Sequence, residues 1–201
     1  MNRLVKFVAL FAALAAGCTT ARAPRYYYLS SAPVSAQAGT TTPFPVTILV
    51  GRVNAPRVLR DDRIIYGMTA VELGIDDYHR WAETPPEMLE QLLVTRLRNS
   101  GQYKAVQRLS SSARGDYVLR GHLFALNEMD DASGIKARFS FQLELFDPKA
   151  GTVVWSERYM HDEPVEKKSV TSVVEALQKN VTAGLDQLAG SLAQYFALKQ
   201  H

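Results

Sequence analysis

The second half of the chain contains three segments in which apolar and polar residues alternate. The alternation is clearest in residues 136–146, where every second position is apolar: Phe139, Phe141, Leu143 and Leu145. A period of two puts these side chains on one face of a strand. Residues 116–128 and 152–159 follow the same pattern, and the stretches 130–134 and 147–151 between them have the composition of hairpin loops. We predict an antiparallel meander with one solvated face.

Two other segments have the period of an α-helix. In residues 168–198 the apolar positions step by three and four along one stripe: Val170, Val173, Val174, Leu177, Val181, Leu185, Leu188, Leu192, Tyr195 and Phe196. About 30 helical residues reach roughly 45 Å, so we expect a bend near Gly184 or Gly190, or a projecting end. We expect the stripe to pack on a core rather than form a coiled-coil seam.

The shorter helix is predicted to begin at Pro85, with Thr84 as its N-cap and Glu87 in its first turn. Its apolar face is formed by Met88, Leu92, Leu93 and Leu97. Residues 99–101, Asn-Ser-Gly, are expected to end it.

Extended segments surround the shorter helix. Residues 45–53 are mostly apolar and are predicted to form a central strand, with short strands at 63–68, 70–73 and 103–106. Three adjacent tyrosines favour an extended conformation in residues 25–30, which we expect to dock on the folded body. Strands grouped with two helices indicate an α+β fold, a two-layer sandwich of a mainly antiparallel sheet with both helices packed on one face. The helices are expected to cover the apolar face of the meander, although a lipid-binding groove there is the alternative.

The amino terminus has the three parts of a secretory signal. A basic opening precedes an apolar run over residues 7–16, which is shorter than the roughly 20 residues that span a bilayer. Residues 14–18, Leu-Ala-Ala-Gly-Cys, resemble a lipobox, so we predict cleavage between Gly17 and Cys18 and lipidation of Cys18. The alternative is an ordinary secretory signal followed by a chance cysteine.

Cys18 is the only cysteine of the chain. A lone free thiol is poorly suited to an oxidising compartment, which favours acylation, for example with palmitate. More than one acyl chain gives lasting membrane attachment. Thr19 stands where an inner-membrane retention signal usually has Asp, so we expect a lipid anchor on the periplasmic face of the outer membrane.

These features divide the chain into three parts. Residues 1–17 form the signal peptide, residues 18–45 a lipidated, flexible tether rich in Ala, Ser, Thr, Pro and Gly, and residues 46–201 the folded domain. Removing the signal takes two of the 23 Lys and Arg and none of the 20 acids, which leaves a net charge of +1. Since no basic stripe is present, we expect no nucleic-acid partner.

The sequence offers little catalytic chemistry. The histidines at positions 79, 122, 161 and 201 have no partners at metal-ligand spacing, and no nucleophile elbow or P-loop occurs. Paired acids such as Asp130 and Asp131 are typical of solvated turns. We therefore expect no enzyme, no metal and no cofactor other than the covalent lipid on Cys18.

Residues 78–83, Tyr-His-Arg-Trp-Ala-Glu, combine large aromatic residues with a cation. Two interpretations remain open. Trp81 fills the junction between sheet and helix, or the segment is a protein-contact surface, because Trp, Tyr and Arg are enriched among interface anchors. Both hold if Trp81 is buried while Tyr78 or Arg80 faces outward.

The order of these elements resembles a known family. A tether with Tyr-Tyr-Tyr-Leu at 26–29 is followed by Val-Asn-Ala-Pro-Arg-Val-Leu at 53–59, Arg-Ile-Ile-Tyr at 63–66 and the segment 78–83 before a Leu-rich helix. This arrangement is similar to the ABC-type transport auxiliary lipoproteins, the PqiC-like family, over nearly all of the mature chain. Thr84, inserted before the proline, departs from the family and leaves the helix start uncertain by one residue.

The resemblance implies a non-enzymatic component of an MCE-type lipid transport system, which also contains a permease, an ATPase and a membrane-anchored MCE-domain protein. The implied role is to dock the MCE protein at the outer membrane so that phospholipid or another hydrophobic solute crosses the periplasm. We assign the partner interface to Tyr66, Tyr78, Arg80 and Trp81. The alternatives are an envelope-assembly lipoprotein that supports an outer-membrane protein without a direct role in lipid transport, and a secreted hydrolase. A homo-oligomer is compatible with either lipoprotein role.

Overall fold

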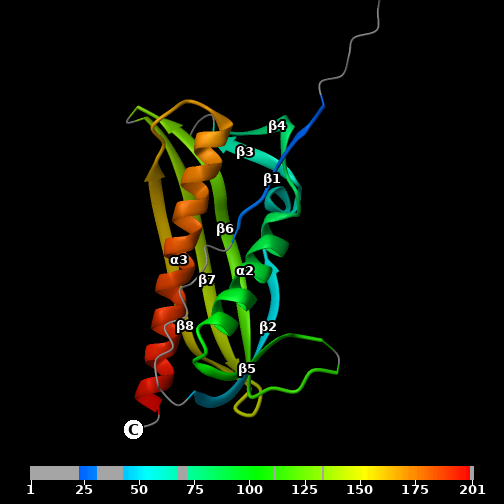
Figure 1. Cartoon of the computed structure of the whole chain (residues 1–201), viewed down its shortest axis with the longest axis vertical. Helices are drawn as coiled ribbons and strands as arrows, with labels where there is room; N and C mark the ends of the chain where they lie inside the picture. Colours follow the sequence, from blue (N-terminus) through cyan, green and yellow to red (C-terminus); the bar gives the residue numbers. More distant parts are fainter. Residues whose placement is uncertain (1–22, 31–42, 68–71, 111, 133, 200–201) are drawn as a thin grey trace, which may run out of the picture.

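Two helices and one open sheet of eight strands make up the part of the chain that the structure describes (Figure 1). The structure is a computed structural model and describes residues 23–30, 43–67, 72–110, 112–132 and 134–199. The strand order is β1-β4-β3-β6-β2-β5, with β7 on the other edge of β6 and β8 on β7. The strands run over the following residues: β1 Arg25–Tyr27, β2 Phe44–Asn54, β3 Arg63–Gly67, β4 Leu73–Trp81, β5 Tyr103–Arg108, β6 Tyr117–Asp131, β7 Gly134–Asp147 and β8 Thr152–Pro164.

Strand β6 is the centre of this sheet. Along one edge its first part pairs with β2 and its end pairs with β3, both parallel. Along its other edge it forms a long antiparallel ladder with β7, which continues into β8. The predicted meander is therefore present, and the mainly antiparallel sheet confirms the predicted fold class. As expected, β2 is an internal strand, since it lies between β5 and β6.

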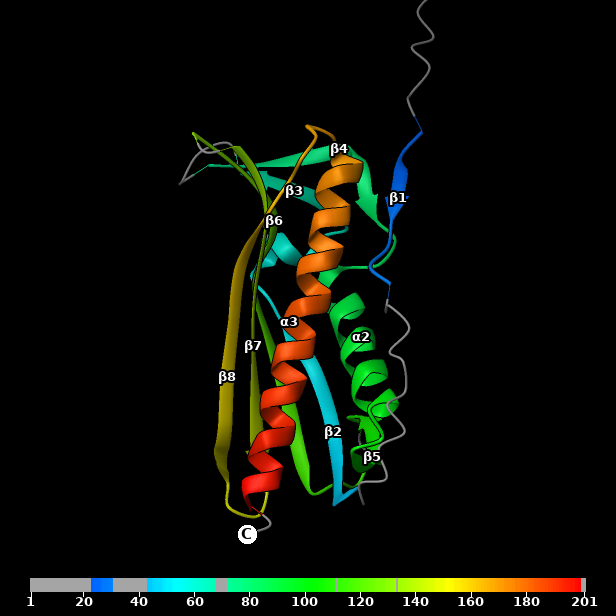
Figure 2. The ribbon, with the colours of Figure 1, turned by 60° about the vertical axis from the view of Figure 1, so that its left-hand side comes forward.

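Both helices pack on the same face of the sheet, which gives the predicted two layers (Figure 2). Helix α2, Pro85–Asn99, covers β2 and β5, whereas helix α3, Val170–Lys199, covers β7 and β8. Thr84 is the N-cap of α2: its backbone N–H and its hydroxyl both donate to the Glu87 carboxylate, at 3.3 and 2.7 Å. This fixes the helix start that the sequence left uncertain.

Helix α3 runs through Gly184 and Gly190 without interruption. It lies along the long strands and not across them (Figure 1). Strands β6 to β8 have 15, 14 and 13 residues, which corresponds to roughly 43–50 Å at 3.3 Å per residue. A helix of roughly 45 Å matches that length, so it needs neither a break nor a projecting end.

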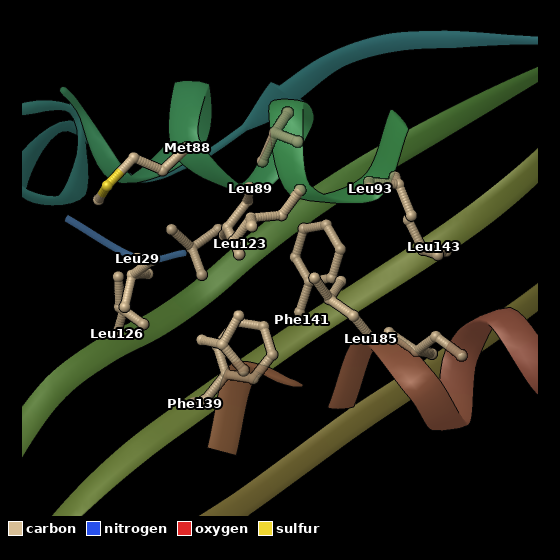
Figure 3. Close-up of a cluster of buried hydrophobic side chains, with 14 of the residues drawn as sticks. Leu29, Met88, Leu89, Leu93, Leu123, Leu126, Phe139, Phe141, Leu143 and Leu185 are labelled. Atoms are coloured by element: carbon tan, nitrogen blue, oxygen red, sulfur yellow. The ribbon is translucent and has the colours of Figure 1, made fainter. Parts of the chain in front are cut away.

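The core lies between the helices and the sheet. Phe139, Phe141, Leu143 and Leu145 are all 0% exposed, so the apolar face of β7 is covered and does not form an open groove. Figure 3 shows the two phenylalanines of this face beside leucines of α2, β6 and α3. Leu29, from the segment next to β1, joins the same cluster.

Strand β4 departs most from the prediction. Only residues 70–73 of this region were expected to be a strand, and residues 68–71 lie outside the described part. Asp76 and Asp77 suggest a turn in the sequence, and the Asp76 carboxylate does accept hydrogen bonds from the backbone N–H groups of Tyr78 and His79, both at 2.8 Å. This local turn forms a kink inside the strand, where the register with β3 shifts. The 3₁₀ helix η1, Arg57–Arg60, was also not predicted.

Candidate docking surface beside the tether strand

The tether joins the folded body through β1. This strand pairs in parallel with the end of β4, with Tyr26 beside Arg80 and Tyr27 beside Trp81. The N–H of Ala82 donates to the carbonyl of Tyr27 at 2.7 Å and extends the ladder. A parallel edge pairing of three residues is weak by itself, so further contacts must hold this segment.

Residues just beyond β1 supply those contacts. Leu29 is 0% exposed and lies among core side chains. The backbone of Ser30 is held by the Gln178 amide of α3, which accepts from the Ser30 N–H and donates to its carbonyl, both at 2.7 Å. The segment from Arg25 to Ser30 is therefore an integral part of the fold. Gly17 and Cys18 themselves lie outside the described residues, so cleavage and lipidation stay predictions.

The predicted interface residues divide between the core and the surface. Trp81 is 1% exposed and belongs to the core cluster. Its side chain therefore fills the junction between sheet and helix and is not available to a partner, which corrects its assignment to the interface. Tyr78 is 47% exposed, and Arg80 is half-buried with its guanidinium 2.8 Å from the Asp62 carboxylate. Successive strand residues point to opposite faces, which accounts for the contrast between Arg80 and Trp81.

Tyr66 is separated from these two residues. It pairs with Gly74 at the far end of β3, whereas Arg63 at the near end pairs with Arg80. Its ring lies over Gly74, where an added Cβ would stand 2.2 Å from the ring. Gly74 thus provides the space for Tyr66, and the ring is a packing element at that end of the sheet. We call Tyr26, Tyr78, Arg80 and helix η1 the tether face.

A groove of about 700 Å³, which we call the arginine groove, is lined in part by η1 of the tether face. Its lining residues are Arg57, Val58, Arg60, Asp61, Arg63 and Ile75. The Arg63 side chain donates to both oxygens of Asp61, at 3.0 and 2.9 Å, and these hydrogen bonds hold the pKa of the Asp61 carboxyl well below its usual range. The sequence analysis did not single out Arg57 and Arg60. The available signal for a helical turn that presents both arginines is that Arg57 directly follows Pro56 and Arg60 stands three residues after Arg57.

The ionised carboxylate of Asp76 stabilises the kink in β4 through hydrogen bonds. Burial alone would raise the pKa of Asp76, but hydrogen bonds from the backbone and ring of His79 and from the backbone of Tyr78 outweigh it and lower the pKa below its ordinary value. The Asp76 carboxylate therefore stays ionised at neutral pH, where it accepts all three hydrogen bonds. These contacts fix the direction in which β4 leaves the kink and presents Tyr78 and Arg80.

A second, polar hollow of about 540 Å³ lies at the start of α2. Glu83, Glu87 and Glu90 face Arg52 and Arg108 across it, with Arg108 Nε 3.5 Å from the Glu90 carboxylate. The opposite charges compensate one another, and Glu87 already caps the helix. Within the described ranges, no group of three His, Cys, Asp or Glu residues is placed to hold a metal ion.

The family profile described as ABC-type transport auxiliary lipoprotein component matches residues 27–189. The chain belongs to this family. The match begins at the last residue of β1 and ends in α3, so it includes Tyr78, Arg80 and η1 of the tether face but not Tyr26. It confirms the resemblance found in the sequence. This ABC-type transport auxiliary lipoprotein is accordingly an envelope protein held at a membrane and associated with an ABC transport system. No helix in the described ranges is both long and apolar enough to span a membrane.

Solved structures share the fold of this auxiliary lipoprotein. Protein XCC0632 from Xanthomonas campestris is 21% identical and superposes with a TM-score of 0.73, over 88% of this chain and 98% of that one. An uncharacterized protein is 17% identical, with a TM-score of 0.65 over 85% and 99% of the two chains. At these identities the similarity concerns the fold alone. No curated protein matches the sequence.

Proposed function

We propose that this protein is the outer-membrane docking component of an MCE-type lipid transport system, anchored by lipid on Cys18. In this role it is not an enzyme: it receives the periplasmic end of an MCE-domain protein, so that phospholipid or a similar solute reaches the membrane. Family membership supports the association with an ABC transporter. The position of the tether face relative to the anchor supports the more specific role.

One observation carries the proposal: the tether is locked to the body seven residues after Cys18. Arg25 is the first residue of β1, and seven residues span at most about 25 Å when extended. The lipid anchor therefore keeps Arg25, at the start of β1, within about 25 Å of Cys18, and β1 pairs directly with the end of β4 that carries Arg80. A protein that delivers lipid to this membrane must also reach the membrane surface, so it would approach the part of the body that lies near the anchor.

The chemistry of the tether face suits a protein partner. Tyr26 and Tyr78 expose 62% and 47% of their surface. Arg80 pairs with Tyr26 across the β1–β4 ladder and follows Tyr78 by two residues on β4. Tyr and Arg are enriched among the residues that dominate binding energy at interfaces. Arg80 is held by Asp62 before any partner binds, so less side-chain entropy is lost on association.

The proposal is tested by a pull-down of residues 25–201 with the periplasmic region of the MCE protein encoded beside this chain. Saturable binding is expected, and Tyr78→Ala combined with Arg80→Ala should weaken it at least about tenfold, as the loss of one interface anchor costs more than 1 kcal/mol. The affinity is measured by titration of the immobilised MCE region.

Phe124→Ala with Arg158→Ala is the matched control, because it also removes one exposed aromatic ring and one arginine. The Arg158 guanidinium stacks 4.2 Å from the Phe124 ring on the sheet face opposite the helices. We expect this control to bind normally. If the folded parent protein did not bind the MCE region, the docking role would be refuted, and the envelope-assembly role would take its place.

A further inference from the structure

We propose that the arginine groove binds the phosphate group of anionic phospholipid headgroups in the membrane that carries the anchor. The inference deepens the proposed function and rests on its lipid anchor at Cys18. The ligand is lipid phosphate at the membrane surface, contacted mainly by Arg57 and Arg60. Four features of the described residues support this assignment.

The first feature is that Asp61, which lines the groove, and the adjacent Asp62 already have arginine partners. Asp61 is held by two hydrogen bonds from Arg63, and Asp62 by Arg80 at 2.8 Å. Asp77 acts electrostatically on Arg63 as well. Asp61 and Asp62 thus compensate Arg63 and Arg80. With Asp77 counted as well, the four arginines exceed the three acids by one positive charge, which is available to an anion at Arg57 and Arg60.

The second feature is the geometry of those two arginines. They are the first and last residues of η1, and both are exposed. Leu59 between them is 4% exposed and fixes the turn in the core, with its N–H donating to the Pro56 carbonyl at 3.0 Å. A buried residue in a short rigid turn therefore presents two guanidinium groups toward one groove. Arginine suits phosphate because its planar fork donates two parallel hydrogen bonds.

The third feature is the apolar part of the lining. Val58 and Ile75 line the same groove as the arginines, and Ile75 is 38% exposed. Leu73, two residues earlier on β4, is 51% exposed. A free phosphate ion gains nothing from apolar walls, whereas the glycerol and upper acyl carbons of a phospholipid do.

The fourth feature is the position of the groove relative to the membrane. Arg63 and Arg80 are paired across β3 and β4, and Arg80 is beside Tyr26 of β1. The lining residues on β3 and β4 thus lie within two strands of β1, which leads to the proposed anchor.

The test uses a chain that begins at Thr19, because lipid on Cys18 would itself bind vesicles. The omitted residues belong to none of the described elements, and XCC0632 forms this fold as a chain that matches 88% of this one. Flotation is measured with vesicles of phosphatidylcholine alone and of phosphatidylcholine mixed with phosphatidylglycerol.

We expect binding to the vesicles that contain phosphatidylglycerol and little binding to phosphatidylcholine alone. A surface arginine contributes about 1 kcal/mol at an anionic membrane, so Arg57→Ala with Arg60→Ala should weaken binding about 30-fold. The matched control is Arg114→Ala with Lys149→Ala, which removes two exposed cations from loops near β5 and β8. The control should bind as the parent chain does. Equal unfolding midpoints for the three chains show that the substitutions leave the fold intact.

Three results would overturn the inference: no preference for phosphatidylglycerol, unchanged binding by the Arg57/Arg60 variant, or equal weakening in the control, which would indicate net charge alone. Inorganic phosphate, added at constant ionic strength, separates the two sources of the ligand. If it stabilised the parent chain against unfolding while the vesicles did not bind, the groove would be a site for free phosphate. The pull-down with the MCE region tests the docking role separately from the vesicle experiment. If the parent chain bound vesicles but not the MCE region, the docking role would be refuted and the headgroup site would remain.

Discussion

Neighbouring residues of β4 have opposite roles. Trp81 is enclosed in the core, and Arg80 is held at the surface by Asp62. His79 faces inward, with its ring 5.9 Å from that of Tyr27, while Tyr78 is 47% exposed. A substitution at one of these positions therefore tests either the fold or binding, but not both.

We predict that Trp81→Ala lowers the free energy of unfolding by about 3–5 kcal/mol, because it removes a large buried side chain and leaves a cavity. Urea-induced unfolding, followed by circular dichroism, measures the change. Tyr78→Ala on the same strand is the control and should change stability by less than about 1 kcal/mol. A similar small loss for Trp81→Ala would contradict its role in the core.

At the scale of elements, the contact between α3 and the sheet has a fixed register. Asn180 is 1% exposed, and its amide donates to the carbonyls of Ala137 and His161 at 2.9 and 2.8 Å. Its carbonyl accepts from the Tyr159 hydroxyl at 2.9 Å. A buried amide with all these partners resists sliding of the helix, since any shift would leave polar groups unpaired.

Gly184, one turn further along, lets the helix approach the sheet. A Cβ at this position would stand 2.6 Å from the Tyr159 ring and 2.9 Å from the Phe139 ring. We predict that Gly184→Ala destabilises the protein by about 1–3 kcal/mol, because rings packed in the core cannot move away freely. Thermal unfolding provides the measurement.

Gly190→Ala is the matched control on the same helix. Nothing lies within 4 Å of a Cβ at that position, so alanine should stabilise the helix by up to about 1 kcal/mol through its higher propensity. The two glycines should therefore give changes of opposite sign. A stabilising Gly184→Ala would show that the helix lies further from the sheet than described.

At the scale of the molecule, the anchor, the tether strand and the tether face form one continuous path. Leu29 in the core and Ser30 on α3 join the tether to both layers of the sandwich. In the proposed role, lipid on Cys18 attaches the body to the membrane at its β1–β4 end. That proposed orientation brings the tether face and the arginine groove to the membrane side.

We predict that Cys18→Ala abolishes acylation. Labelled palmitate should be incorporated into the parent protein and not into the variant. Thr20→Ala, in the same segment, should be acylated normally. Palmitate on the Cys18→Ala variant would place the anchor elsewhere and remove the basis for the membrane-side orientation.

Local periodicity in the sequence determined both helices and the long strands, but not β4 or η1. The alternation in β7 and the three-four spacing in α3 each follow from one side of the element facing a core, and such a pattern is visible without knowledge of the partner. The capping residues Thr84 and Glu87 marked the start of α2 in the same local way. The order of these motifs, together with the tyrosines of the tether, also indicated the family that the profile confirmed.

Only the tertiary structure decided which strands pair and which side chains meet. The parallel pairings of β1 with β4 and of β2 with β6 join distant segments, and a strand has the same side-chain period whatever its partner or direction. Trp81 could be placed in the core, and Arg57 and Arg60 in a groove with Ile75, only once those pairings were known. Pairing depends on packing free energy summed over the whole sheet, which no single segment of sequence contains.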